Sequence, residues 1–169
     1  VSRGLGDVYK RQEENLRMAK PDATKEEMEA VLQKVNLLGF LQTQNGLQTE
    51  LLEKAGNLSG GQCQRLVIAR ALLRSDSAVY IFDEAASNID VESEEMIMNV
   101  IHELAKTKTV LLISHRLANV VQSDQIYFLK NGTICERGTH AELMEQNGAY
   151  RHLYDSQMVL ENYGKQGNA

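Results

Sequence analysis

The sequence predicts an α/β domain, because two short apolar strands flank one helix and further helical stretches precede them. The strand candidates, residues 78–82 and 109–114, are apolar without polar alternation, which is typical of strands covered on both faces in a parallel sheet. Between them, apolar residues recur at helical spacing over residues 96–104. Together the three segments predict a βαβ unit with a right-handed crossover.

The segments on either side of this unit carry local start and turn patterns. Thr24 with Glu27, and Thr139 with Glu142, have the spacing of capping boxes and predict helix starts. Another helix is predicted after residue 61 and ends near residue 74, at a polar stretch. Asn131-Gly132 separates the apolar segments 126–129 and 133–135, which predicts a β-hairpin.

Composition excludes several classes of protein. The chain has 169 residues, 43% of them hydrophobic, which is enough for one packed core. A net charge of -5 without a cluster of Lys and Arg argues against a nucleic-acid partner. The longest apolar runs are much shorter than the roughly 20 residues of a membrane helix. Cys63 and Cys135 lie far apart without metal-ligand spacing, which argues against a disulfide framework or a zinc site.

Four short motifs occur in an order that is specific to one family. Residues 58–65 (LSGGQCQR) resemble the signature of ABC transporters, and residues 79–84 (VYIFDE) resemble the Walker B strand. Residues 86–90 (ASNID) resemble the D-loop, and residues 114–116 (SHR) resemble the switch-histidine loop. The chain is therefore similar to the nucleotide-binding domain of exporter-type ABC transporters, which implies part of a RecA-like P-loop NTPase sheet with an α-helical subdomain.

The resemblance covers about residues 13–155 and suggests a division of the chain into four parts. The first part resembles a translated sequencing adapter and is left out of the fold prediction. The second is the helical subdomain with the signature loop, the third is the RecA-like core, and the fourth is a polar tail. Their bounds are 1–12, 13–60, 61–154 and 155–169.

The signature chemistry needs a close approach to phosphate. Glycines at a helix start let backbone N–H groups reach phosphate oxygens, and helix N-termini favour anions. Ser59 can cap this helix or donate its hydroxyl to a γ-phosphate; taken alone, the same residues would be an ordinary Ser-Gly-Gly turn. The resemblance implies these nucleotide-binding residues: Leu58, Ser59, Gly60, Gly61, Gln62 and Asp90.

Two carboxylates and one histidine are the candidates for hydrolysis. Asp83 and Glu84 end an apolar strand, where a carboxylate is costly unless it meets a cation, so we expect Mg²⁺ nearby. The resemblance implies that Asp83 serves the Mg²⁺, that Glu84 is the general base for water, and that His115 contacts the γ-phosphate. The simpler alternatives are an acidic helix cap and a structural histidine.

No G-x-x-x-x-G-K-[ST] motif occurs in the sequence, and the Q-loop is also missing. We therefore expect the chain on its own to be inactive and to expose apolar faces of its strands. The resemblance implies ATP and Mg²⁺ as cofactors, a head-to-tail dimer with a second nucleotide-binding domain, a transmembrane domain encoded upstream, and a place at the cytoplasmic face of the plasma membrane.

Two other functions stay open at this stage. Non-transport ABC ATPases of chromosome maintenance, repair or the ribosome share most of these motifs, although Gln62 and Gln64-Arg65 favour transport. A degenerate, noncatalytic ABC domain is the other alternative, and the presence of Glu84 and His115 argues against it. Nothing in the sequence identifies the transported substrate.

Overall fold

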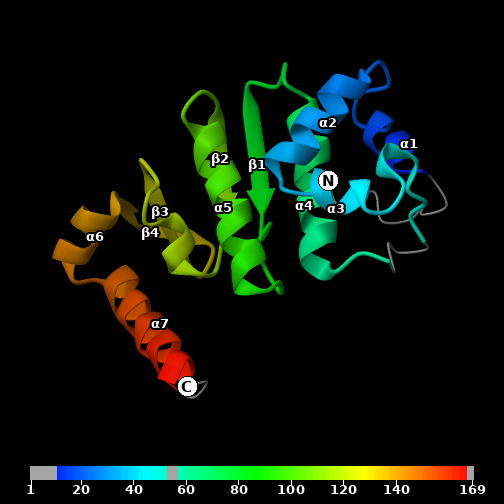
Figure 1. Cartoon of the computed structure of the whole chain (residues 1–169). Helices are drawn as coiled ribbons and strands as arrows, with labels where there is room; N and C mark the ends of the chain where they lie inside the picture. Colours follow the sequence, from blue (N-terminus) through cyan, green and yellow to red (C-terminus); the bar gives the residue numbers. More distant parts are fainter. Residues whose placement is uncertain (1–10, 53–56, 167–169) are drawn as a thin grey trace. The chain divides into compact units, whose positions relative to one another are not determined.

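The computed structural model describes residues 11–52 and 57–166 as helices and short strands joined by loops (Figure 1). The chain divides into two compact units, residues 1–111 and 112–169, each described by itself below. Most of the first twelve residues lie outside the described part. The first helix, α1, begins at Gln12, whose N–H donates to the Thr49 carbonyl at 2.9 Å.

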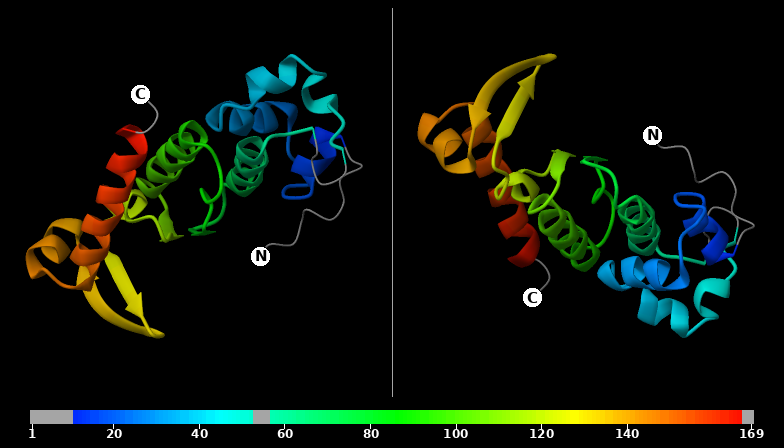
Figure 2. Two further views of the ribbon diagram at one scale, coloured as in Figure 1. Left: turned by 90° about the horizontal axis from the view of Figure 1, so that it is seen from below. Right: turned by 90° about the horizontal axis from the view of Figure 1, so that it is seen from above.

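The first unit begins with a group of helices. They are α1 (Gln12–Arg17), α2 (Lys25–Lys34), α3 (Leu38–Gln42), the 3₁₀ helix η1 (Gly46–Gln48) and α4 (Gly60–Leu73). The capping box of Thr24 and Glu27 at the start of α2 is confirmed, with both of its hydrogen bonds present. Helix α2 packs against α4, and the two lie side by side in Figures 1 and 2.

The βαβ segment consists of β1 (Val79–Asp83), α5 (Val91–Ala105) and β2 (Thr109–Ile113). The strands β1 and β2 are hydrogen-bonded neighbours in a two-stranded sheet. Helix α5 also contacts α4, so the helix of the signature and the helix after the D-loop belong to one packed group. The predicted α/β class is thus confirmed.

The prediction that residues 78–82 are covered on both faces is wrong for this structure. Exposure alternates along β1: Tyr80 and Phe82 are buried, whereas Val79 and Ile81 are 55% and 65% exposed. A two-stranded sheet lacks the neighbours that would cover its second face. The related expectation, that these strands expose apolar faces, is confirmed.

The second unit begins at Leu112, within β2. It contains η3 (Leu117–Val120), the hairpin strands β3 (Ile126–Lys130) and β4 (Thr133–Gly138), and the helices α6 (His140–Gln146) and α7 (Ala149–Gln166). Asn131 and Gly132 both have positive φ, 52° and 76°, as a type I′ hairpin turn requires, so the predicted hairpin is confirmed. Helix α7 runs through residue 155 without a break.

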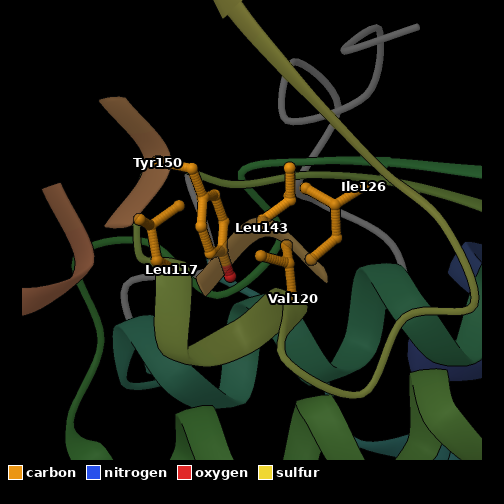
Figure 3. Close-up of a cluster of buried hydrophobic side chains, with 5 residues drawn as sticks. All are labelled: Leu117, Val120, Ile126, Leu143 and Tyr150. Atoms are coloured by element: carbon orange, nitrogen blue, oxygen red, sulfur yellow. The ribbon is translucent and has the colours of Figure 1, made fainter. Parts of the chain in front are cut away.

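One small core holds this second unit together. Figure 3 shows its five buried side chains: Leu117, Val120, Ile126, Leu143 and Tyr150. The carboxylate of Glu136 on β4 accepts hydrogen bonds from the N–H groups of Ala149 and Tyr150, at 2.6 and 3.1 Å. These contacts fix the start of α7 against the hairpin. Within the described part of the chain, no helix has the length and apolar content of a membrane span.

Candidate functional site

The signature residues form the N-terminus of the 14-residue helix α4. Ser59 is the N-cap: its Oγ accepts from the Gln62 N–H at 3.2 Å, and its own N–H donates to Gln62 Oε1 at 2.8 Å. This capping box satisfies two backbone donors and fixes the direction in which the helix starts. Ser59 remains exposed, and its hydroxyl hydrogen is still available to donate to a phosphate.

The two signature glycines have different surroundings. Gly60 is exposed, and a β-carbon there would lie 4.0 Å from its nearest neighbours, which is ordinary contact. Gly61 is buried, and a β-carbon there would lie 2.3 Å from Ser93 Oγ and 3.1 Å from Asp90 Oδ2. Gly60 is thus open to solvent or to another molecule, whereas Gly61 is required by packing within the chain.

Asp90 is the N-cap of helix α5 in this structure. Its Oδ1 accepts from the Ser93 N–H at 2.8 Å. This backbone hydrogen bond, with a further one from the Ser93 side chain, lowers the pKa of the Asp90 carboxyl below its ordinary value. The starts of α4 and α5 therefore meet, with the carboxylate of Asp90 close to Gly61.

The chain turns sharply where β1 ends. Glu84 has a φ of 53°, in the left-handed region that non-glycine residues rarely adopt. The Ser87 N–H and hydroxyl both donate to the Glu84 carbonyl, at 3.0 and 2.9 Å, and hold the turn. Asp83 is exposed, so the expectation of a carboxylate buried at this strand end is wrong; with one face of β1 open, solvent reaches it.

The switch-histidine loop lies in the second unit. The His115 side chain is exposed, while its backbone carbonyl accepts from Gln157 Nε2 at 2.8 Å. Ser114 Oγ accepts from the Arg116 N–H at 3.1 Å. Sequence reasoning placed Gln157 in the polar tail and missed this contact, because no local pattern connects residues 42 positions apart.

The described residues contain no group of three or more His, Cys, Asp or Glu side chains arranged to hold a metal ion. An exposed carboxylate such as Asp83 fits the way Mg²⁺ is bound beside nucleotides, through one or two carboxylates, water and phosphate oxygens. The donor set therefore fits a Mg²⁺ that enters with a nucleotide.

A glycine-led helix start, an Asp-Glu pair at a strand end and a histidine after the next strand are typical of α/β proteins that bind nucleotides. Comparison with known proteins narrows this class. The family model described as "ABC transporter" matches residues 4–87. The chain therefore belongs to the ABC transporter family and is part of an exporter-type nucleotide-binding domain.

Individual relatives agree with this family. An uncharacterized ABC transporter ATP-binding protein of Haemophilus influenzae is 51% identical over 156 residues, 92% of this chain and 28% of that protein. An ATP-dependent lipid A-core flippase of Mannheimia succiniciproducens is 46% identical over 140 residues, 82% of this chain and 24% of the flippase. The chain thus spans about a quarter of the length of these relatives.

A solved structure matches the fold as well. The structure of a bacterial Atm1-family ABC exporter with ATP bound aligns with a TM-score of 0.80 at 29% identity. The alignment covers 89% of this chain and 26% of the exporter chain. This match confirms the predicted fold class, a partial P-loop NTPase sheet with the helices of an ABC domain.

Proposed function

We propose that this chain is the signature and hydrolysis portion of an ABC exporter's nucleotide-binding domain, in which ATP hydrolysis drives transport across a membrane. The observation that carries the proposal is the presence, in one compact unit, of the exposed Ser59-Gly60 helix start and the Asp83-Glu84 turn. The matched relatives are named as transporter proteins, and none of these names supports the non-transport alternative.

The signature helix start is suited to a nucleotide held by another domain. Ser59 and Gly60 are exposed, and the positive end of a 14-residue helix favours phosphate. In a head-to-tail dimer, Leu58, Ser59, Gly60 and Gln62 of one domain face the nucleotide of the other. Gly61 supports this surface from within its own chain, and Asp90 holds the adjacent start of α5.

Hydrolysis uses residues at the ends of β1 and β2. Glu84, held in its turn by Ser87, accepts a proton from the attacking water as general base. His115 donates a hydrogen bond toward the γ-phosphate and keeps that water in line. Asp83 would hold Mg²⁺, which would supply positive charge to neutralise the phosphate oxygens.

The P-loop motif that such a nucleotide-binding domain needs does not occur in this sequence. We propose that a P-loop segment and a transmembrane domain in a longer polypeptide complete the exporter, since the matched regions make up only 28% and 24% of these relatives. In this proposal the chain lies at the cytoplasmic face of the plasma membrane.

The test is hydrolysis and transport by the complete gene product in proteoliposomes. We expect Mg²⁺-dependent ATP hydrolysis, and we expect Glu84→Gln to lower kcat by roughly 10²- to 10⁴-fold while ATP still binds. Glu95→Gln, an exposed change of the same kind on α5, serves as the control and keeps the normal rate. Absence of hydrolysis by the unaltered protein would refute the proposal, and a fully active Glu84→Gln would refute the role of Glu84.

A further inference from the structure

Gln157 on α7 makes two hydrogen bonds to the main chain of the switch-histidine loop. Its Nε2 donates to the His115 carbonyl at 2.8 Å, and its Oε1 accepts from the Leu117 N–H at 2.9 Å. One planar amide therefore holds the peptide groups on both sides of Arg116. We propose that Gln157 is a positioning residue that fixes the orientation of His115 for ATP hydrolysis; this inference rests on the proposed function.

The helix that carries Gln157 is itself firmly anchored. Glu136 caps the start of α7 through the N–H groups of Ala149 and Tyr150. Tyr150 is fully buried in the core, together with Leu117. Gln157 follows Tyr150 by seven positions, so both side chains lie on the same face of the helix. The Gln157 amide therefore extends to the switch-histidine loop from a helix that is held at its start by Glu136 and the core.

The loop also has a contact among its own residues. Ser114 Oγ accepts from the Arg116 N–H and donates to the Arg116 carbonyl, which closes a short local turn. Such a turn fixes the loop relative to itself, whereas the bonds from Gln157 fix it relative to the core of its unit. The exposed imidazole of His115 is thus carried by a backbone that Gln157 holds in place.

A positioning role predicts an effect on kcat rather than on substrate affinity. Displacing a catalytic group by about 1 Å can cost roughly 100-fold in rate, so we expect Gln157→Leu to lower kcat by about 10- to 100-fold. The KM for ATP should stay close to normal, because no contact to ATP is removed. Gln146→Leu, the same change at an exposed position of α6, is the control and should keep normal kcat.

Hydrogen exchange reports on the contact directly and does not depend on activity. In the complete gene product, the Leu117 amide should exchange faster in Gln157→Leu than in the unaltered protein or in Gln146→Leu. Gln157→Glu keeps an acceptor for Leu117 but loses the donor to the His115 carbonyl. It should therefore retain protection at Leu117 and still lose part of kcat.

A double-mutant cycle separates positioning from general structural support. If Gln157 acts through His115, adding Gln157→Leu to His115→Ala should cause no further loss of kcat. Full additivity of the two losses, or normal kcat and Leu117 exchange in Gln157→Leu, would overturn the inference. Absence of hydrolysis by the unaltered protein is a different result: it refutes the proposed function, and with it any catalytic role of Gln157.

Discussion

Gly61 and Ser93 lie so close together that a β-carbon on Gly61 would be 2.3 Å from the Ser93 hydroxyl oxygen. Gly61 belongs to the signature helix, and Ser93 lies in the first turn of α5, directly after the D-loop. In the proposed dimer the signature helix faces the nucleotide of the other domain. This contact packs the start of α4 against the start of α5 within one chain.

This contact predicts that the two signature glycines tolerate substitution differently. Gly61→Ala must push Ser93 away, and overpacking of this kind costs about 1–3 kcal/mol of stability. Gly60→Ala meets nothing closer than 4.0 Å and should be nearly neutral for the fold. Hydrogen exchange of the first turns of α4 and α5 in the complete protein is the measurement. Gly39→Ala, with no atom within 4 Å, is the control, and equal exchange in all three variants would contradict the prediction.

Asp90 predicts an acid-sensitive contribution to stability. The Ser93 N–H lowers the pKa of its carboxyl in the folded state, so this contribution is present above the pKa of the unfolded chain, about 3.9, and is lost as pH falls through the folded value. Asp90→Asn keeps an N-cap that does not titrate. Urea unfolding of the excised nucleotide-binding domain, at neutral pH and at about pH 3, should show a smaller acid loss in Asp90→Asn. Equal losses would show that the cap carries no acid sensitivity.

The parts of the fold predicted from sequence are those whose causes are local. The capping box of Thr24 and Glu27 and the turn at Asn131-Gly132 depend on residues at most three positions apart, and both occur as expected. The covering of β1 depends instead on neighbouring strands, and among the described residues only β2 lies beside it, so one face stays open. An apolar run predicts that a strand is suited to burial, but it does not predict which neighbouring elements cover the strand.

In the candidate site, too, the features with local causes were predicted from sequence and those with long-range causes were not. The signature motif correctly predicted a helix start at Ser59, because the capping box depends only on the local residues 59–62. The support of that site is long-range: Gly61 meets Ser93, and His115 is held by Gln157, 42 positions away. Neither pair has a periodicity or spacing that a single sequence reveals, so both had to come from the structure.

The proposed head-to-tail arrangement predicts complementation between two inactive variants. Glu84→Gln removes the general base of a chain's own site, whereas Gly60→Asp places a side chain and a negative charge where the partner's phosphate would approach. A mixed dimer of the two keeps one site with an intact Glu84 and an intact signature. We expect each variant alone to be inactive and the co-expressed pair to regain hydrolysis.

Tagging the two variants differently and purifying through both tags isolates the mixed dimer. The matched control is a mixed dimer in which one chain carries both substitutions and the other carries Glu84→Gln, because neither of its sites is complete. Recovery in the first pair and not in the control supports composite sites. No recovery in either pair would contradict the division of roles between Gly60 and Glu84.

The open face of β1 predicts opposite effects of one substitution in two settings. Ile81 is 65% exposed in this chain, and exposed apolar strands promote aggregation. Ile81→Lys should therefore raise the solubility of the chain expressed by itself, without giving it measurable ATP affinity in calorimetry, because no P-loop is present.

In the complete protein, where we propose that further core strands cover this face, the same lysine would be buried without a partner and should abolish folding or assembly. Lys108→Ile, an apolar change at an intermediate position before β2, tests whether hydrophobicity alone sets solubility. If Ile81→Lys were harmless in the complete protein, β1 would not be a covered strand, and the proposal that this chain is one portion of a larger sheet would fail.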